Sequence, residues 1–274
     1  MNFKKYFKDK VVIITGASSG IGLACVNEFA SHGSIVVLAA RSLEIIKNVA
    51  ENINLNGGKA LAIKTDVTNP KDCENLISET IKHFGRIDIL INNAGISMRA
   101  LFVDVDFKVI RQLMEVNFFG TVYCSKYALP YLIKSKGSLI GISSIAGFHG
   151  LPGRTGYSAS KFAMHGLLET IRIENFKNGL HVMIVAPGFT SSNIRKNALL
   201  ADGSKQGESP RIEERMMKPE EVARAIVRGI IFRRRNIILT KQGMLTVFLQ
   251  RILPRLIDKI IYKHMATEPD SPFK

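Results

Sequence analysis

The stretch that decides the fold is Val11-Val12-Ile13-Ile14-Thr15-Gly16-Ala17-Ser18-Ser19-Gly20-Ile21-Gly22. A short apolar run ends in a glycine-rich turn, and a helical pattern begins at Ile21. Strand, glycine-rich turn and helix in this order are typical of a dinucleotide site. Gly16 permits the tight turn, Gly20 lets the backbone approach a pyrophosphate, and Gly22 lets the helix lie close to the strand. The free N–H groups at the start of the helix would then face the phosphates.

The alternation of strand and helix continues along the chain. Apolar runs without polar alternation indicate strands that are covered on both faces. Repeated strand–helix–strand units with short links give a right-handed parallel arrangement. We therefore expect an α/β fold, a Rossmann doubly wound parallel sheet of about seven strands with helices on both faces. The expected strands are 11–15, 34–39, 60–64, 87–91, 138–143, 180–185 and 236–240, and the expected helices are 21–31, 43–55, 70–84, about 105–135, 155–177 and one opening at Pro219.

Two segments depart from this rhythm. Residues 190–218 include a polar stretch at 201–210, which suits an active-site lid or, alternatively, a plain surface insertion. Residues 243–274 form a basic, amphipathic C-terminal extension to a Rossmann-type domain at 1–242. The chain contains no run of about 18 apolar residues, so we expect no membrane-spanning helix. Its start also lacks the apolar core of a signal peptide.

The sequence contains no pattern that predicts a metal site or a disulfide. Cys25, Cys73 and Cys124 are scattered and odd in number, which fits a reducing cytoplasm. The histidines have no partners at ligand spacing, so we expect core or surface roles for them: His149, His165 and His181. We therefore expect a cytoplasmic protein without a metal.

Tyr157 and Lys161 lie four residues apart, and Tyr157 follows Ser144 by thirteen residues. On a helix, positions i and i+4 share one face. A nearby ammonium group favours the phenolate and lowers the pKa of a tyrosine from about 10 toward neutrality. Such a tyrosine can give a proton to a carbonyl oxygen or take one from an alcohol. By itself the same spacing also suits an ordinary surface pair on a helix.

Four blocks of sequence occur together: Thr15–Gly22, Asn92-Asn93-Ala94-Gly95, Ser144 with Tyr157 and Lys161, and Pro187-Gly188. On these blocks the chain, over about residues 8–240, resembles the short-chain dehydrogenase/reductase family. The resemblance implies hydride transfer between a nicotinamide cofactor and a carbonyl compound or an alcohol. It also implies a catalytic tetrad of Asn117, Ser144, Tyr157 and Lys161.

In the family that the chain resembles, each residue of the tetrad has a role. Ser144 would hydrogen-bond the carbonyl oxygen, Tyr157 would protonate it, and Lys161 would lower the pKa of Tyr157 and bind the nicotinamide ribose. Asn117 would hold a water molecule for proton relay, although an Asn in an apolar helix also suits a cap or a kink. Ser143 competes with Ser144 for the serine role, and the thirteen-residue spacing favours Ser144.

The charge at the end of the second strand indicates which cofactor binds. An NAD site places an acid about 20 residues past the glycines, whereas this chain has Ala40 and Arg41. A planar cation suits a 2′-phosphate, and Ser18 and Ser42 add hydroxyl donors, so we expect NADP(H). Some NADP-dependent members of the family carry a basic residue just before the second glycine, where this chain has Ser19.

The resemblance extends the cofactor site to other strand ends. Asp66 would hold the adenine amino group, Val67 would pack on the ring, and residues 93–95 would approach the ribose. The loop after Pro187 would hold the carboxamide, with Thr190, Ser191 and Ser192 as alternative partners. The residues expected to contact the cofactor are Gly16, Ser18, Ser19, Gly20, Ile21, Gly22, Arg41, Ser42, Asp66, Val67, Asn93, Ala94, Gly95, Tyr157, Lys161, Pro187, Gly188 and Thr190.

The formal net charge is +15, and residues 224–263 hold ten basic side chains against one acid, Asp258. Such a block suggests an anionic partner. Residues 243–265 follow a helical pattern that Pro254 would kink or restart. This segment covers the substrate pocket or a subunit interface, or it lies peripherally on the inner face of an anionic membrane. Nucleic acid fits poorly, because the basic residues flank apolar ones.

These features together predict an NADPH-dependent oxidoreductase that interconverts a ketone or aldehyde and its alcohol on a small, lipophilic substrate. The alternative is a non-catalytic NADP(H)-binding scaffold or redox sensor, docked to a membrane through the extension. Members of the family often pair through the helices expected here at about 105–135 and 155–177. We therefore expect a homodimer or homotetramer.

Overall fold

The computed structural model describes residues 3–209, 216–269 and 271–273. Its strands form one sheet in the order β3-β2-β1-β4-β5-β6-β7, and every neighbouring pair is parallel. The strands are β1 (Val11–Thr15), β2 (Ile35–Ala40), β3 (Lys59–Lys64), β4 (Ile89–Asn92), β5 (Ser138–Ile142), β6 (His181–Ala186) and β7 (Asn236–Ile238). The strand expected at 87–91 therefore starts and ends slightly later than the apolar pattern indicates.

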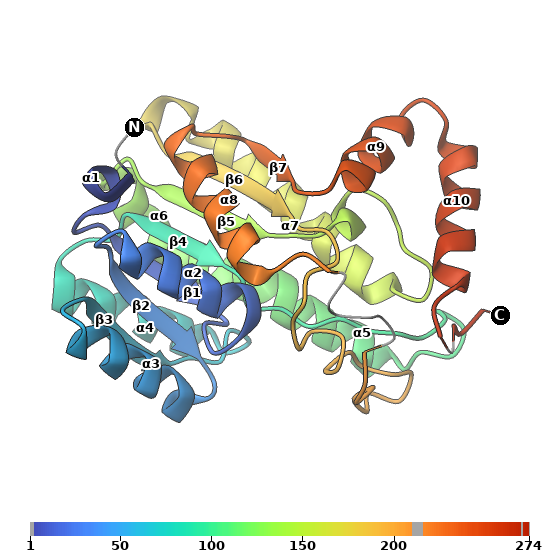
Figure 1. Ribbon diagram of the computed structural model, residues 1–274, viewed down its shortest axis with the longest axis horizontal. Coiled ribbons are helices and arrows are strands. Elements are labelled where there is room, and N and C mark those ends of the chain that lie inside the picture. The colour runs from blue at the N-terminus through green and yellow to red at the C-terminus, as the bar shows by residue number, and fades with distance from the viewer. Residues whose placement is uncertain (1–2, 210–215, 270, 274) are drawn as a thin grey trace.

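The helices lie on both sides of this sheet (Figure 1). They are α1 (Phe3–Phe7), α2 (Gly20–Ser31), α3 (Leu43–Leu55), α4 (Pro70–Phe84), α5 (Phe107–Leu113), α6 (Gly120–Lys134), α7 (Thr155–Glu174), α8 (Pro219–Ile231), α9 (Lys241–Leu249) and α10 (Pro254–Ala266). Within the described ranges, short 3-10 helices follow β5 and α7: η2 (Ile145–Gly147) and η3 (Phe176–Asn178).

Alternate residues of β1 to β6 supply two separate cores, one on each face of the sheet. Val12 and Ile14 of β1 pack with α2, α3 and α8, whereas Val11 and Ile13 pack with α4, α6 and α7. All five residues of β1 are buried, which is why its sequence is apolar without alternation. The expected doubly wound α/β fold is confirmed.

The helix expected at about 105–135 is divided into three segments. A π-helix, η1 (Met114–Phe119), separates α5 from α6. Asn117 lies within it, and π-helical turns are frequent at functional sites. The side chain of Asn117 is completely buried and bonds to groups outside the helix. The widened turn thus accompanies an inward-facing polar residue that an amphipathic pattern does not indicate.

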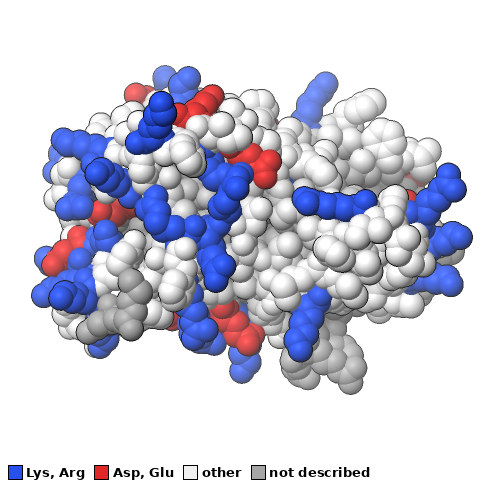
Figure 2. Space-filling view, turned by 90° about the horizontal axis from the view of Figure 1, so that it is seen from above, with Lys and Arg blue, Asp and Glu red and all other residues white. Residues whose placement is uncertain are grey.

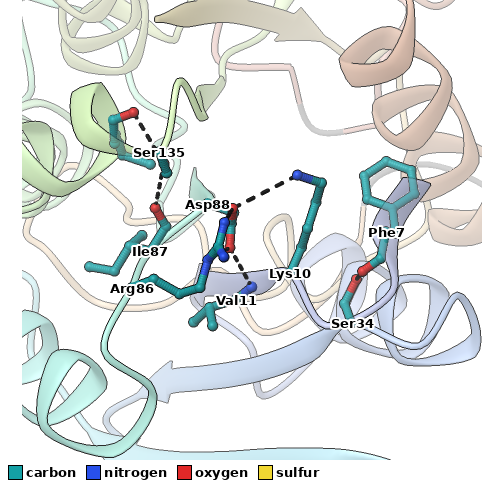
Figure 3. A network of polar contacts seen from close by, with 9 residues as sticks. Phe7, Lys10, Val11, Ser34, Arg86, Ile87, Asp88 and Ser135 are labelled. Atoms are coloured by element: carbon teal, nitrogen blue, oxygen red, sulfur yellow. Dashed lines mark hydrogen bonds and ion pairs between the residues drawn. The ribbon is translucent and has the colours of Figure 1, made fainter. Parts of the chain in front are cut away.

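A polar network stabilises the edge of the sheet where the strands begin (Figure 3). The Asp88 carboxylate accepts hydrogen bonds from Val11 N at 3.0 Å and from Arg86 Nε at 2.9 Å, and Lys10 Nζ lies 3.8 Å away. Nearby, Ser135 Oγ donates to Ile87 O at 2.7 Å. This network joins the starts of β1 and β4, and it leaves the opposite edge for ligands, where parallel α/β sheets bind them.

The insertion and the extension lie beyond that opposite edge. Residues 190–209 contain turns and isolated bridges, including Thr190 with Met217 and Leu199 with Met98; residues 210–215 of the expected lid lie outside the described residues. Pro254 starts a second helix, so α9 and α10 form the extension. Within the described ranges, no helix is long and apolar enough to cross a membrane.

Candidate active site

The glycine-rich turn after β1 has the backbone that its sequence requires. Gly16 has φ +65° and Gly20 has φ +53°, values that are easy for glycine and costly for other residues. A Cβ at Gly22 would lie 2.2 Å from Gly16 O, so α2 approaches the turn closely. Ser19 at the N-cap makes no side-chain capping bond. This cradle suits a pyrophosphate at the start of α2.

The second sequence block holds this turn in place. Asn93 Nδ2 donates to Thr15 O at 2.9 Å, and Thr15 Oγ1 accepts from the backbone N–H groups of Asn93 and Ala94 at 3.0 Å. A Cβ at Gly16 would lie 2.9 Å from Ala94 Cα. The ends of β1 and β4 thus interlock through residues that are far apart in sequence.

Gly95 lies at the point where two of the expected catalytic residues meet. A Cβ at Gly95 would lie 3.1 Å from Asn117 Oδ1 and 3.6 Å from Lys161 Nζ. Asn117 Oδ1 accepts from Ile96 N at 2.9 Å, and its Nδ2 donates to Ser160 Oγ at 2.9 Å. Asn117 therefore connects the loop after β4 to the helix that carries Lys161.

Lys161 is buried on α7, where its Nζ donates to Ile142 O at 2.8 Å. Its Nζ lies 5.8 Å from the centroid of the Tyr157 ring. Burial lowers the pKa of Lys161 from 10.5 to about 8. Lys161 can therefore exchange a proton nearer to neutral pH than an exposed lysine can.

Tyr157 has a different electrostatic environment from the one that its spacing predicts. Burial raises the pKa of Tyr157, while its hydrogen bond with Ser144 and the charge of Arg154 oppose that rise. The pKa of Tyr157 is thus not lowered as expected in this structure, because loss of hydration outweighs the hydrogen bond with Ser144 and the charge of Arg154.

Ser143 and Ser144 have different partners, which separates the two serine candidates. Ser143 Oγ lies 2.6 Å from Nε2 of buried His165 on α7. Ser144 caps η2, accepting from Ala146 N at 3.2 Å, and also bonds Tyr157. Ser144 is therefore the serine beside the phenol. Of the core or surface roles expected for the histidines, His165 is buried and has the core one.

Other expected cofactor contacts lie at the ends of β2 and β3. Arg41 and Ser42 follow β2 and are exposed, as a contact with a 2′-phosphate requires. Asp66 follows β3, and its Oδ1 accepts from Thr68 N at 3.0 Å and Thr68 Oγ1 at 2.8 Å. Val67 is buried against Gly120, whose Cβ would lie 2.8 Å from Val67 Cγ2.

The loop after β6 completes the arrangement. Pro187 and Thr190 are buried, and Thr190 Oγ1 donates to Gly188 O at 3.1 Å. A Cβ at Gly20 would lie 3.1 Å from Ser192 Cβ, so this loop reaches the glycine-rich turn. Ser18 is half-buried in that turn and Ile21 packs at the start of α2.

An apolar wall lies beside Tyr157. Its members come from the loop after β4, from α5 and from the insertion, and they are Met98, Ala100, Val109, Leu113 and Leu199, all buried. Among the described residues, no group of three or more His, Cys, Asp or Glu side chains is placed to hold a metal. The site therefore combines a cluster of polar side chains with an apolar wall.

Sequence reasoning missed the contacts that the extension makes with this site. Gln250 follows α9; its Nε2 donates to Phe148 O at 2.8 Å, and its Oε1 lies 2.9 Å from His149 Nδ1. Arg154 immediately precedes α7 and lies 3.2 Å from Glu268. No local pattern pairs residues so distant in sequence, so spacing alone gave no signal for them.

A family model described as short chain dehydrogenase matches residues 10–202. "Dehydrogenase/reductase SDR family member 7B" of Bos taurus is 31% identical over 279 residues, covering 99% of this chain and 86% of that protein. "11-beta-hydroxysteroid dehydrogenase A" of Arachis hypogaea is 42% identical over 201 residues, covering 73% of this chain and 56% of that protein.

Two solved structures have a similar fold. A short chain dehydrogenase/reductase from Burkholderia phymatum, in complex with NAD, aligns with a TM-score of 0.81 at 23% identity and covers 91% of this chain and 95% of its own. An alcohol dehydrogenase from Thermococcus sibiricus, complexed with 5-hydroxy-NADP, aligns with a TM-score of 0.76 at 24% identity, covering 85% and 96%. At these identities the likeness concerns the fold.

Proposed function

Since the chain belongs to the short-chain dehydrogenase/reductase family, we propose that it interconverts a ketone or aldehyde and the corresponding alcohol with NADP(H). The observation that carries this proposal is the convergence of Asn117, Ser144, Tyr157 and Lys161 beside the glycine-rich turn. A scaffold that only bound the cofactor would need the turn and not these four polar side chains.

In the proposed reaction the bound nicotinamide supplies or accepts the hydride. Ser144 holds the substrate oxygen, and Tyr157 donates the proton to that oxygen in reduction or removes it in oxidation. Lys161, with its pKa lowered to about 8, returns a proton to Tyr157. Asn117 fixes the loop after β4 against α7 through Ile96 and Ser160.

Charge supports NADP(H) as the proposed cofactor. Arg41 is exposed just beyond the end of β2, and the preceding residue is Ala40. An acid at this point would bind the ribose hydroxyls of NAD and repel a 2′-phosphate, whereas a guanidinium suits that phosphate. The cradle of Gly16, Gly20 and Gly22 accommodates either dinucleotide.

The apolar wall beside Tyr157 supports a lipophilic substrate. Its buried side chains offer an apolar surface next to the phenol that would protonate the substrate oxygen.

The exposed surface of α9 and α10 supports a second part of the proposal: a cytoplasmic protein that lies peripherally on the inner, anionic face of a membrane. Large apolar side chains there are 47–62% exposed: Met244, Leu245, Phe248, Ile252, Leu253, Leu256 and Ile260. Exposed basic residues lie among them: Lys241, Arg251, Arg255, Lys259 and Lys263. Such a surface suits the boundary between headgroups and acyl chains.

Figure 2 supports this reading of the extension. It shows the end occupied by α9 and α10 as largely white surface carrying separate blue side chains.

We also propose a homo-oligomer formed through α6 and α7. The supporting observation is that each helix exposes an aromatic side chain: Tyr131 on α6 is 37% exposed, and Phe162 on α7 is 46% exposed.

Replacement of Tyr157 by phenylalanine tests the proposed activity. The parent protein should reduce members of a panel of steroid, lipid and small carbonyl compounds faster with NADPH than with NADH. Tyr157→Phe should lower kcat by about 10²–10⁴-fold and leave the Kd for NADPH within about twofold, measured by absorbance and fluorescence titration. Tyr131→Phe on α6 is the matched control. Full turnover in Tyr157→Phe would refute the mechanism, and NADPH binding without turnover by the parent would favour the scaffold.

A further inference from the structure

The segment after α10 folds back onto two loops of the active site. Glu268 is 5% exposed and Arg99 is 9% exposed, and such residues are rarely buried without partners. Glu268 Oε2 lies 3.2 Å from Arg154 Nη2 and 3.8 Å from Arg99 Nε. Arg99 Nη2 also donates to Pro269 O. One carboxylate thus lies between a buried guanidinium group, that of Arg99, and a half-buried one, that of Arg154.

The two arginines belong to the loops that build the site. Arg99 lies four residues after Gly95, and Arg154 lies three residues before Tyr157. The loops also pair through their backbones, because Ala100 N donates to Gly153 O at 3.1 Å. Arg99 N donates to Leu199 O at 2.8 Å, which adds the insertion to the same junction. Glu268 therefore connects the extension to two of these loops, and the backbone of Arg99 joins the insertion to them.

The rest of the segment is anchored on both sides. Tyr262 Oη on α10 donates to Phe273 O at 3.3 Å, and the two rings lie 5.3 Å apart. Gly153 has φ +68°, and a Cβ there would lie 3.3 Å from Pro272 Cγ. Glu268 thus belongs to a strap, residues 267–269 and 271–273, that α10 holds against the start of α7.

The position of Glu268 also affects the charge that acts on Tyr157. The groups around the phenol are Arg154 before α7, Lys161 on α7 and Ser144 after β5, whereas α5 and the insertion present apolar side chains. Arg154 favours the phenolate and so lowers the pKa of Tyr157. A carboxylate beside Arg154 offsets part of that positive charge.

We propose that Glu268 is a positioning residue of the active site, through which the C-terminal strap holds Arg154 and the start of α7 in the geometry that Tyr157 needs. The proposal rests on the proposed role of Tyr157. It assigns the carboxylate, rather than the bulk of the extension, as the link between the end of the chain and the phenol. Removal of the carboxylate takes an anionic partner away from buried Arg99 and from Arg154, whose side chain is 12% exposed.

Glu268→Gln in the full-length protein tests the proposal, with Glu174→Gln, an exposed carboxylate at the end of α7, as the control. We expect Glu268→Gln to lower kcat on the order of 10-fold to 100-fold with the Kd for NADPH within about twofold. The limb of the pH profile of kcat that reports Tyr157 should move to lower pH, because the charge of Arg154 is no longer offset. Glu268→Asp, which keeps the charge, should restore the position of that limb.

Hydrogen exchange gives a readout that does not depend on turnover. Amides at 153–158 should exchange faster in Glu268→Gln, whereas amides at 164–171 in the middle of α7 should not. The proposal would be overturned if Glu268→Gln had the kcat and the pH profile of the parent protein. It would also be overturned if kcat fell while the pH profile stayed unshifted and amides exchanged faster throughout the protein. If Tyr157→Phe is inactive while Glu268→Gln behaves like the parent, only this inference fails and the proposed function stands.

Discussion

The loop after β5 places two adjacent serines in different environments. Ser144 faces the phenol, and Ser143 is held by His165, which is 8% exposed and packs edge-on against Phe148 at 4.5 Å between ring centroids. A Cβ at Gly147 would lie 2.6 Å from Ser143 Oγ, so this glycine allows the pair to form. The contact with His165 thus occupies Ser143, and Ser144 bonds the phenol.

The buried histidine should make stability depend on pH. Burial, assisted by the charge of Lys161, lowers the pKa of His165 from 6.5 to about 4. Below pH 6.5 the unfolded chain therefore binds a proton that the folded protein does not. The free energy of unfolding should fall by up to about 3 kcal/mol between pH 6.5 and pH 4, measured by urea denaturation.

Two variants separate the causes of that fall. His165→Gln should lose this contribution, leaving a shallower dependence on pH to which His181, whose pKa burial also lowers, still contributes. Ser143→Ala keeps the buried histidine and should retain most of the fall, because burial is the main cause. Identical pH dependence in the parent and His165→Gln would contradict this account.

The backbone of the glycine-rich turn was predictable, because Gly16, Gly20 and Gly22 belong to a short block with a backbone requirement. Their φ values and close approaches are those of a tight turn against a helix, and their contact with a phosphate stays a prediction. The contact of Arg154 with Glu268 was not predictable, because the residues are 114 positions apart and no local pattern relates them. The electrostatic environment of Tyr157 depends on burial, which spacing does not report.

At the scale of elements, polar groups lie both where the strands of the sheet begin and where they end, and the two sets have different roles. The edge where the strands end carries the site, and the edge where they begin carries Asp88 (Figure 3). Asp88 is 2% exposed and accepts from the backbone of β1 and from Arg86, which is itself 55% exposed. We infer that this second edge serves stability and not turnover.

Asp88→Ala should therefore lower the free energy of unfolding by about 2–3 kcal/mol, because Val11 N loses its buried acceptor and Arg86 loses its partner. The value is discounted for the exposure of Arg86. Denaturation in urea measures it, and kcat should remain within about twofold of the parent. Glu79→Ala, which removes a surface pair with Lys82 at 3.2 Å, should cost only about 0.5 kcal/mol. Equal losses in the two variants would show that the Asp88 network adds nothing.

The bounds of helices whose apolar residues keep one regular spacing were predictable. A change of helix type within a continuous apolar pattern was not. The bounds of α3 and α4 agree with the pattern to the residue. The region at 105–135 reads as one helix because its apolar spacing continues through η1. The π-helical turn there accommodates Asn117, and its partners Ile96 and Ser160 come from other elements.

At the scale of the whole molecule, the exposed apolar and basic surface of α9 and α10 lies at the end of the protein away from α1 and α3 (Figure 1). The inner sides of these helices are occupied, because Gly243, Ile257 and Met265 are buried. One side of the extension therefore packs against the rest of the protein, and the other side is exposed, as the proposed membrane contact requires.

Vesicle binding tests the outer side. The protein should co-sediment with phosphatidylserine-containing vesicles, less in high salt and less with phosphatidylcholine alone. Arg255→Gln, Lys259→Gln and Lys263→Gln combined should weaken partitioning about 100-fold, since each basic residue contributes about 1 kcal/mol at an anionic surface. The matched control, Arg224→Gln, Arg228→Gln and Arg234→Gln, removes the same charge from α8 and the turn after it. Equal loss in both sets would indicate attraction by net charge alone.

The anchoring of Phe273 by Tyr262 has a practical bearing on how the protein is purified and assayed. An affinity tag or reporter fused after residue 274 would be attached to the strap that binds Arg154. It would therefore disturb the loop before α7, and with it the activity that is being measured. Figure 1 shows the two termini at opposite ends of the molecule. A fusion at the amino-terminal end would leave the contact between Glu268 and Arg154 undisturbed.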